Sequence, residues 1–115
     1  MLLKTTDPVM VRNVTLTDDV HPGDVLIFGN RPEICTNRGF AGERNYGIGT
    51  FGGEYAGTAD GAIAAGDEVY YNKATGKVTK TVTGAKHLGF CTWAPSGCAD
   101  GSEILIWHAP NGTAK

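Results

Sequence analysis

The residues that could do chemistry in this sequence are its histidines and cysteines, His21, His87, His108, Cys35, Cys91 and Cys98. Imidazole nitrogens and thiolates are the ligands that Zn²⁺ prefers in proteins, and zinc sites usually take them in closely spaced pairs. No Cys-x-x-Cys, His-x-x-x-His or His-Glu-x-x-His spacing occurs here, so we predict no metal site. We expect Cys35 and Cys91 to be small buried side chains. His87 and His108 are expected to lie on the faces of strands.

The arrangements used in nucleophilic catalysis and phosphate binding are also missing from the sequence. No Gly-x-Ser-x-Gly motif occurs, and both serines, Ser96 and Ser102, lie in turn-forming segments. Cys91 and His87, four residues apart on one predicted strand, would be about 13 Å apart, too far for proton transfer within that strand. Segment 47–53 matches Gly-x-Gly-x-x-Gly, but neither a βαβ context nor a following helix accompanies it. We predict a protein that is not an enzyme and has no cofactor.

The elements that must position these residues are short strands. No part of the sequence shows sustained apolar periodicity of 3.6 residues, and glycines interrupt every candidate helix. Strand-like segments between turn signals are found at 9–16, 24–28, 33–36, 46–51, 68–72, 77–83, 87–93 and 103–108. Many short strands without crossover helices predict an all-β fold, a small glycine-rich β-barrel or β-sandwich.

One short pattern recurs at the starts of these strands. It consists of an apolar residue, two variable residues, a glycine and a polar residue, and it occurs at 20–24 and 63–67 and more loosely at 39–43 and 98–102. The glycine allows a tight turn, and the carboxylate that follows usually accepts backbone N–H bonds. We therefore predict a repeated structural corner, with Gly23 and Asp24 in one copy and Gly66 and Asp67 in another.

Composition restricts the class of protein further. The chain has 115 residues, which is one small domain, and 17 of them are glycine. Ten basic and 12 acidic residues give a net charge of −2 without a dense basic block, which argues against nucleic-acid binding. No apolar segment is long enough for a signal peptide or a membrane span. An odd number of cysteines is unlike a secreted disulfide scaffold, so we expect synthesis in a reducing cytosol.

Several aromatic residues lie in a glycine-rich, weakly charged part of the sequence. Tyr46, Phe51 and Tyr55 are close together there, with Arg44 just before them. Aromatic side chains in such a segment either fill the core or form a binding surface or subunit interface.

With these residues considered, the sequence resembles the tailed-phage capsid cement (head decoration) proteins. The similarity is strongest in Gly-Ala-Ile-Ala-Ala-Gly-Asp-Glu-Val-Tyr-Tyr at 61–71, Thr-Gly-Lys-Val-Thr at 75–79 and Leu-Gly-Phe at 88–90. A final hydrophobic strand at 103–107 and the segments 21–27 and 40–43 also fit the family. The resemblance extends over roughly residues 20–112 and is looser between 30 and 57, where segment 31–55 is richer in arginine, glycine and aromatic residues than is usual in the family.

The resemblance implies a non-enzymatic β-barrel that binds the outer surface of the expanded phage head and stabilises it. Such proteins commonly sit as homotrimers at local three-fold positions and clamp adjacent subunits of the major capsid protein. The implied location is the outside of the virion, after synthesis in the cytoplasm of the bacterial host. Neither nucleic acid nor membrane is an expected partner.

Two regions are expected to make the contacts. We expect residues 1–12 to form an extended N-terminal arm and residues 13–115 to form a single β-barrel domain. The arm would order on the capsid, adding a strand to a capsid sheet; its contact residues would be Leu2, Leu3, Pro8, Val9 and Val11. The second region, a capsid or subunit interface, would consist of Arg44, Tyr46, Phe51 and Tyr55.

Two other classes of protein remain open from the residues alone. A small ligand- or carbohydrate-binding β-barrel could use Trp93 and Trp107 as stacking platforms. A carrier barrel of the biotinyl or lipoyl type shares glycine–aspartate corners and presents a modifiable lysine at a hairpin tip. Lys73 and Lys77 lie near such a turn but lack the methionine that usually flanks the modified lysine.

Overall fold

The computed structural model describes residues 1–4 and 9–111 of the chain. The regular secondary structure of these residues is entirely β, which confirms the predicted all-β class. The strands are β1 (Leu2–Leu3), β2 (Met10–Thr15), β3 (Val25–Phe28), β4 (Arg31–Cys35), β5 (Arg44–Phe51), β6 (Glu54–Asp60), β7 (Glu68–Asn72), β8 (Lys77–Thr79), β9 (Lys86–Trp93) and β10 (Glu103–His108). A search of the same residues for a helix long and apolar enough to span a membrane found none.

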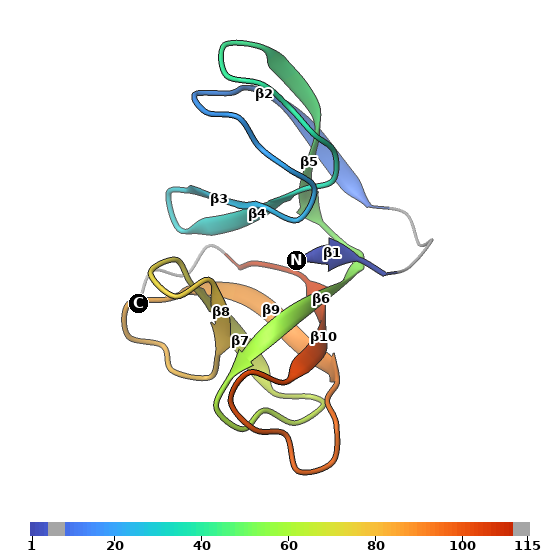
Figure 1. Cartoon of the computed structure of the whole chain (residues 1–115), viewed down its shortest axis with the longest axis vertical. Helices are drawn as coiled ribbons and strands as arrows, with labels where there is room; N and C mark the ends of the chain where they lie inside the picture. Colours follow the sequence, from blue (N-terminus) through green and yellow to red (C-terminus); the bar gives the residue numbers. More distant parts are fainter. Residues whose placement is uncertain (5–8, 112–115) are drawn as a thin grey trace.

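The strands form two sheets, which appear as two lobes in Figure 1. The C-terminal lobe, residues 54–111 together with β1, has the strand order β1-β6-β10-β9-β7-β8. In this lobe β6 also pairs with β8, in parallel, so the pairing from β6 through β10, β9, β7 and β8 returns to β6. The N-terminal lobe, residues 9–53, is a four-stranded sheet of order β2-β5-β4-β3. It therefore keeps two unpaired edges, at β2 and β3.

The two lobes have hydrophobic cores of different size. A small core in the N-terminal lobe consists of Leu16, Val20, Cys35 and Ile48. The larger core includes Val69, Tyr71, Val78, Leu88, Cys91, Ile104 and Ile106 of the C-terminal lobe. Val25 and Ile34 of the N-terminal lobe belong to this larger core as well. Apolar packing is therefore continuous across the junction of the lobes.

Hydrogen bonds also join the lobes at several points. The His108 imidazole donates from Nε2 to the carbonyl oxygen of Pro32 at 2.8 Å. Arg31 donates to the carbonyl oxygen of Pro110 at 3.0 Å, and Lys73 donates to that of Val25 at 2.9 Å. The N-terminal ammonium donates to the carbonyl oxygen of Gly23 at 2.6 Å. The polar contacts thus anchor the β3–β4 hairpin and the corner before it to the C-terminal lobe.

The repeated sequence pattern has one backbone geometry in both lobes. Gly23 and Gly66 have φ angles of 95° and 92°, a region that disfavours residues with a Cβ. Asp24 Oδ2 accepts the N–H of residue 21 at 2.8 Å, and Asp67 Oδ2 accepts that of residue 64 at 2.9 Å. In each corner the glycine N–H donates to the carbonyl oxygen of one partner residue. The N–H of that same partner donates back to the carbonyl oxygen of the residue after the glycine. The glycine and partner pairs are Gly23 with Cys35, Gly66 with Cys91, Gly42 with Leu16, and Gly101 with Ala59.

The N-terminal residues that the structure describes are paired within the chain. Leu2 and Leu3 lie opposite Ala56 and Tyr55 of β6. β2 pairs with β5 from Met10 onwards, so the arm boundary expected at residue 12 falls inside a strand. The expectation of a free arm that orders only on a capsid does not fit these paired residues. Pro8, also expected in the arm, lies outside the described residues.

Candidate interaction surfaces

The structure brings the histidines and cysteines to separate places. In the described part of the chain, no three His, Cys, Asp or Glu side chains gather as a metal site would require. Cys35 and Cys91 are both 1% exposed, as predicted for small buried side chains. Burial raises the pKa of Cys35 to about 11 and raises that of Cys91 above its usual value. Both thiols are therefore protonated at neutral pH, which makes them weak nucleophiles.

His108 and Tyr55 form a buried polar pair at the junction of the lobes. Their rings meet edge to face with centroids 5.7 Å apart. Burial lowers the pKa of His108 to about 4 and raises that of Tyr55 to about 12, so both are neutral at physiological pH. The pair fills space between the sheets. Because Tyr55 is fully buried, it offers no surface to a partner, and the expectation that it lies at an interface is corrected.

Five apolar residues from β1, from segment 9–11 and from the end of β5 lie near the junction of the lobes. Met10 of β2 lies opposite Phe51 at the end of β5. A Cβ added to Gly53 would lie 2.8 Å from a methyl of Val9 and 2.9 Å from one of Leu3, so both side chains cover the backbone of this glycine. We call these four residues, together with Val11, the next residue of β2, the seam patch; its exposed fractions reach 65% at Met10 and 50% at Val11. Large exposed apolar groups of this kind mark interaction sites.

A second apolar surface covers the outer side of the sheet in the C-terminal lobe. Leu2, Ala56, Leu105 and Trp93 are consecutive partners across β1, β6, β10 and β9. Trp107 lies opposite Phe90 in the next row. Directly opposed residues share one face of a sheet. We call these six residues the aromatic face, in which Trp93 is 50% and Phe90 39% exposed.

A third surface lies at the end of the N-terminal lobe, in loop 36–43 and at the start of β5. Four large exposed side chains occur there: Arg38, Phe40, Arg44 and Tyr46. The Arg38 guanidinium lies over the Phe40 ring, 4.9 Å from its centroid. Tyr46 is 67% exposed, the largest value among the large hydrophobic residues described. We call this group the tip; it contains Arg44 and Tyr46, which the sequence placed at an interface.

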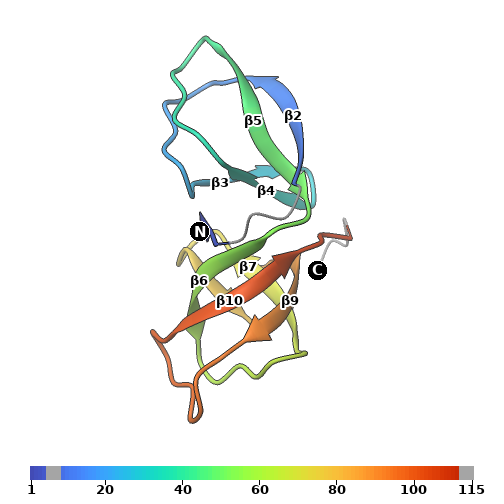
Figure 2. The same cartoon turned by 90° about the vertical axis from the view of Figure 1, so that its right-hand side faces the viewer.

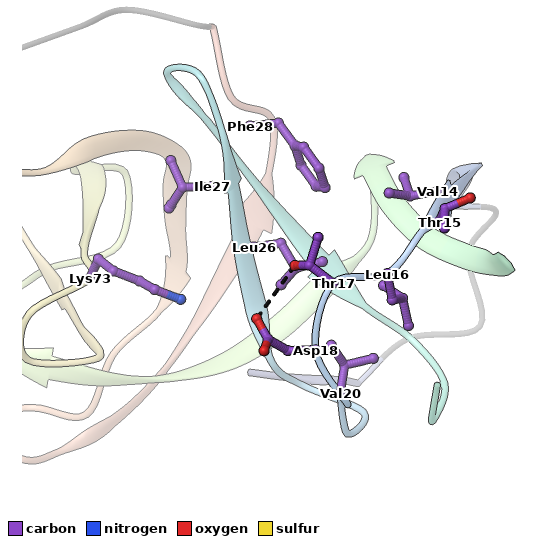
Figure 3. A pocket seen from close by; sticks show the side chains of 10 residues that line it. All are labelled: Val14, Thr15, Leu16, Thr17, Asp18, Val20, Leu26, Ile27, Phe28 and Lys73. Carbon is purple, nitrogen blue, oxygen red and sulfur yellow. Dashed lines mark hydrogen bonds between the residues drawn. The ribbon is translucent and has the colours of Figure 1, made fainter. Parts of the chain in front are cut away.

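An apolar cavity of about 350 Å³ lies between the unpaired edges β2 and β3 (Figure 3). Its lining is mainly apolar, from Val14 and Leu16 on one side and Leu26 and Phe28 on the other. Lys73 reaches it from the C-terminal lobe, but its ammonium is bound to the carbonyl of Val25. The lining presents neither a nucleophile beside a base nor a pair of carboxylates, and we assign it no chemistry.

Sequence reasoning found part of these surfaces. It named Leu3, Val9, Val11 and Phe51 of the seam patch and Leu2 of the aromatic face. It did not group Phe90 and Leu105 with the two tryptophans, because that grouping depends on strand pairing. The period-two pattern of β10 could have indicated which residues face outwards, since Leu105 and Trp107 alternate there with buried isoleucines.

Comparison with known proteins gives one result that bears on identity. Searches of curated proteins and of solved structures returned no match to this chain. The family model described as phage cement protein matches residues 4–106. Because this match spans nearly the whole chain, the chain belongs to the phage cement protein family.

Proposed function

We propose that this protein decorates the outside of a phage head and stabilises the expanded shell, with the seam patch as its contact to the major capsid protein. Family membership supports the capsid role. The observation that carries the choice of surface is the cluster of exposed apolar side chains around Met10 and Phe51. Met10 lies on the unpaired edge strand β2, where a partner can bury these side chains and also reach backbone groups.

Stabilisation follows from mass action. A protein that binds the expanded shell and not the unexpanded or broken one lowers the free energy of the closed state at every site it occupies. At a free concentration 100 times the dissociation constant, this contribution is about 2.7 kcal/mol per site. A shell offers many equivalent sites, so moderate affinity at each one sums to a large effect. We propose homotrimers at the three-fold positions, synthesised in the host cytoplasm, as the form that binds.

Co-sedimentation with phage heads tests the proposal. Purified protein is mixed with expanded, DNA-free heads of the parent phage, and separately with unexpanded shells, and the bound fraction is measured on a gradient. We expect saturable binding to expanded heads at a whole-number ratio to capsid subunits, and no binding to unexpanded shells. Failure of the wild-type protein to sediment with intact expanded heads would contradict the proposed function.

Substitutions in the seam patch test the choice of surface. Met10→Asp and Phe51→Asp place a charge where we propose an apolar contact, so each should weaken head binding at least tenfold, a loss of about 1.4 kcal/mol or more. Thr81→Asp adds the same charge at an exposed loop position in the C-terminal lobe and serves as the control. Head binding equal to that of the control would exclude the seam patch as the capsid contact.

Carbohydrate binding is a second candidate function, favoured by one observation. Trp93 and Leu105 line a shallow depression together with Lys4, Glu54 and Glu103. An indole ring beside carboxylates is a suitable platform for a sugar ring. This function predicts a saturable change in tryptophan fluorescence on titration with soluble oligosaccharides, and loss of that change in Trp93→Ala. Unchanged fluorescence over the whole titration would reject it.

A further inference from the structure

We propose that the aromatic face of one copy binds the tip of a second copy, so that the chain assembles head to tail. The inference rests on the proposed function in one respect, because it assigns the interface of the trimer proposed above. It uses surfaces that differ from the seam patch, which stays available for the capsid.

The aromatic face combines apolar area with acidic borders. Trp107 lies opposite Glu54, and Phe90 lies opposite Glu68, so a carboxylate bounds each end of this row. Glu54 is bound to the Thr92 hydroxyl, and Glu68 to the imidazole of His87 at 2.8 Å. Glu103 is exposed beside Trp93 and Leu105. Three carboxylates and one ammonium, that of Lys4, therefore surround the aromatic surface.

The tip has the complementary chemistry. Arg38 and Arg44 supply two exposed guanidinium groups. Two carboxylates lie in the same region: Glu43 in the segment itself, and Asp19, which accepts the backbone N–H of Ala41 at 2.8 Å. Guanidinium groups bind carboxylates through paired hydrogen bonds and stack on aromatic rings. Arginine and aromatic residues are also the types enriched at protein–protein interfaces. An acid-bordered indole surface such as the aromatic face is therefore a fitting partner for the tip.

The positions of the two surfaces exclude their meeting within one copy. The tip is at the far end of the N-terminal lobe, at the top of Figure 1. The aromatic face belongs to β6, β10 and β9, which lie side by side at the front of the lower lobe in Figure 2. The molecule is 42 Å long, and the two surfaces lie in opposite lobes. Contact between two different surfaces is heterologous, and a three-fold rotation between successive copies would close it into the proposed trimer, in which every copy uses both surfaces.

Complementation between two variants tests this geometry. The tip variant carries Arg38→Ala and Arg44→Ala, and the face variant carries Trp93→Ala and Glu103→Arg, so that the two altered surfaces cannot pair through exchanged charges. Thr81→Arg, at an exposed loop position, is the charge control, and circular dichroism checks that each protein is folded. Oligomeric state is measured by sedimentation velocity and native mass spectrometry. We expect the wild type and the control to form closed oligomers, and each variant alone to dissociate at concentrations at least tenfold higher than the wild type.

The mixture of the two variants gives the decisive result. The face variant keeps an intact tip and the tip variant keeps an intact face, so mixing them should give a heterodimer and nothing larger. A wild type that remains monomeric, variants that assemble as the wild type does, or a mixture without heterodimer would each overturn the inference. If the wild type still co-sediments with expanded heads in those cases, the proposed function stands. Loss of wild-type head binding would instead contradict the proposed function, whatever the oligomeric state.

Discussion

The two lobes share one type of corner but differ in how their sheets end. In the C-terminal lobe, the parallel pairing of β6 with β8 brings the pairing of five strands back to β6. In the N-terminal lobe, β2 and β3 remain unpaired, and the apolar cavity lies between them. The same local turn therefore supports both a sheet with continuous pairing and a sheet with two open edges.

This difference suggests that one lobe supplies most of the stability and the other most of the binding contacts. The C-terminal lobe contains most of the large core, which also takes in Val25 and Ile34 of its neighbour. The N-terminal lobe has four residues in its own core, and it carries the tip and most of the seam patch. Open edges and exposed apolar residues are costly for a free protein but useful for one that functions on a surface. We infer that the C-terminal lobe is the scaffold on which the N-terminal lobe presents its contacts.

The largest expected effect comes from truncating the two cores. Ile104→Ala, in the large core, should reduce the free energy of unfolding of the whole chain by about 4 kcal/mol. Ile48→Ala, in the small core, should cost about 3 kcal/mol and act mainly on the N-terminal lobe. Both tryptophans are in the C-terminal lobe, so their fluorescence reports that lobe alone, whereas amide hydrogen exchange reports both.

Hydrogen exchange distinguishes the two truncations. Ile48→Ala should remove protection from β2 and β5 at denaturant concentrations where β9 and β10 stay protected. Thr81→Ala, an exposed control, should change stability by about 0.5 kcal/mol or less. If, in each of the two variants, both lobes lose protection at the same denaturant concentration, the chain unfolds as one unit and the proposed division between the lobes is wrong.

The next largest effect concerns acid stability at the junction. The pKa of His108 is about 4 in the folded chain against 6.5 for an ordinary histidine. Between pH 4 and pH 6.5, the unfolded chain therefore binds a proton on this imidazole that the folded chain does not bind. The contribution of neutral His108 is fully present above pH 6.5 and is lost as the pH falls towards 4. This loss amounts to about 3 kcal/mol of unfolding free energy. Urea unfolding across this pH range measures it.

A matched variant isolates the histidine. His108→Gln keeps an N–H donor for the Pro32 carbonyl but does not titrate, so its unfolding free energy should vary less with pH between 4 and 6.5. An unchanged pH slope in this variant would assign the acid sensitivity to other groups.

The smallest expected effect compares the two aspartate corners. Asp24→Ala and Asp67→Ala each remove a side-chain acceptor of a backbone N–H, and each should lower Tm by a few degrees. Asp67 also pairs with Lys80 at 3.2 Å, so Asp67→Ala should lower Tm more than Asp24→Ala does. Its pKa is lowered, chiefly by the backbone N–H of Ala64, so the difference should disappear in acid as Asp67 becomes protonated. Equal Tm losses at neutral pH would show that the Lys80 pair contributes nothing.

The sequence predicted strands well where apolar and polar residues alternate. Segments 68–72 and 103–108 coincide with β7 and β10. It failed at β6, which pairs with three other strands, because this strand is composed largely of small residues. Gly57 shows the reason: a Cβ there would lie 2.8 Å from a side-chain carbon of Val78. The close approach of β8 requires glycine at this position, and glycine gives no strand signal.

The interaction surfaces were predictable only where they are local in sequence. Tyr46 and Phe51 could be singled out because they lie in one weakly charged segment, but Tyr55 belongs to the same segment and is buried. The aromatic face needs the register of β9 against β10, where a bulge between Leu105 and Ile106 places Trp93 opposite Leu105. Long-range register is set by the packed sheet, so single-sequence patterns could not supply it.

The most direct test of this division between the surfaces is a cryo-electron microscopy map of expanded heads decorated with the wild-type protein. We predict copies on the outside of the shell, with Met10 and Phe51 directed at the major capsid protein. The tip of each copy should contact Trp93 of the next copy around the three-fold axis. A map in which the seam patch faces solvent, with the aromatic face against the shell, would contradict the account.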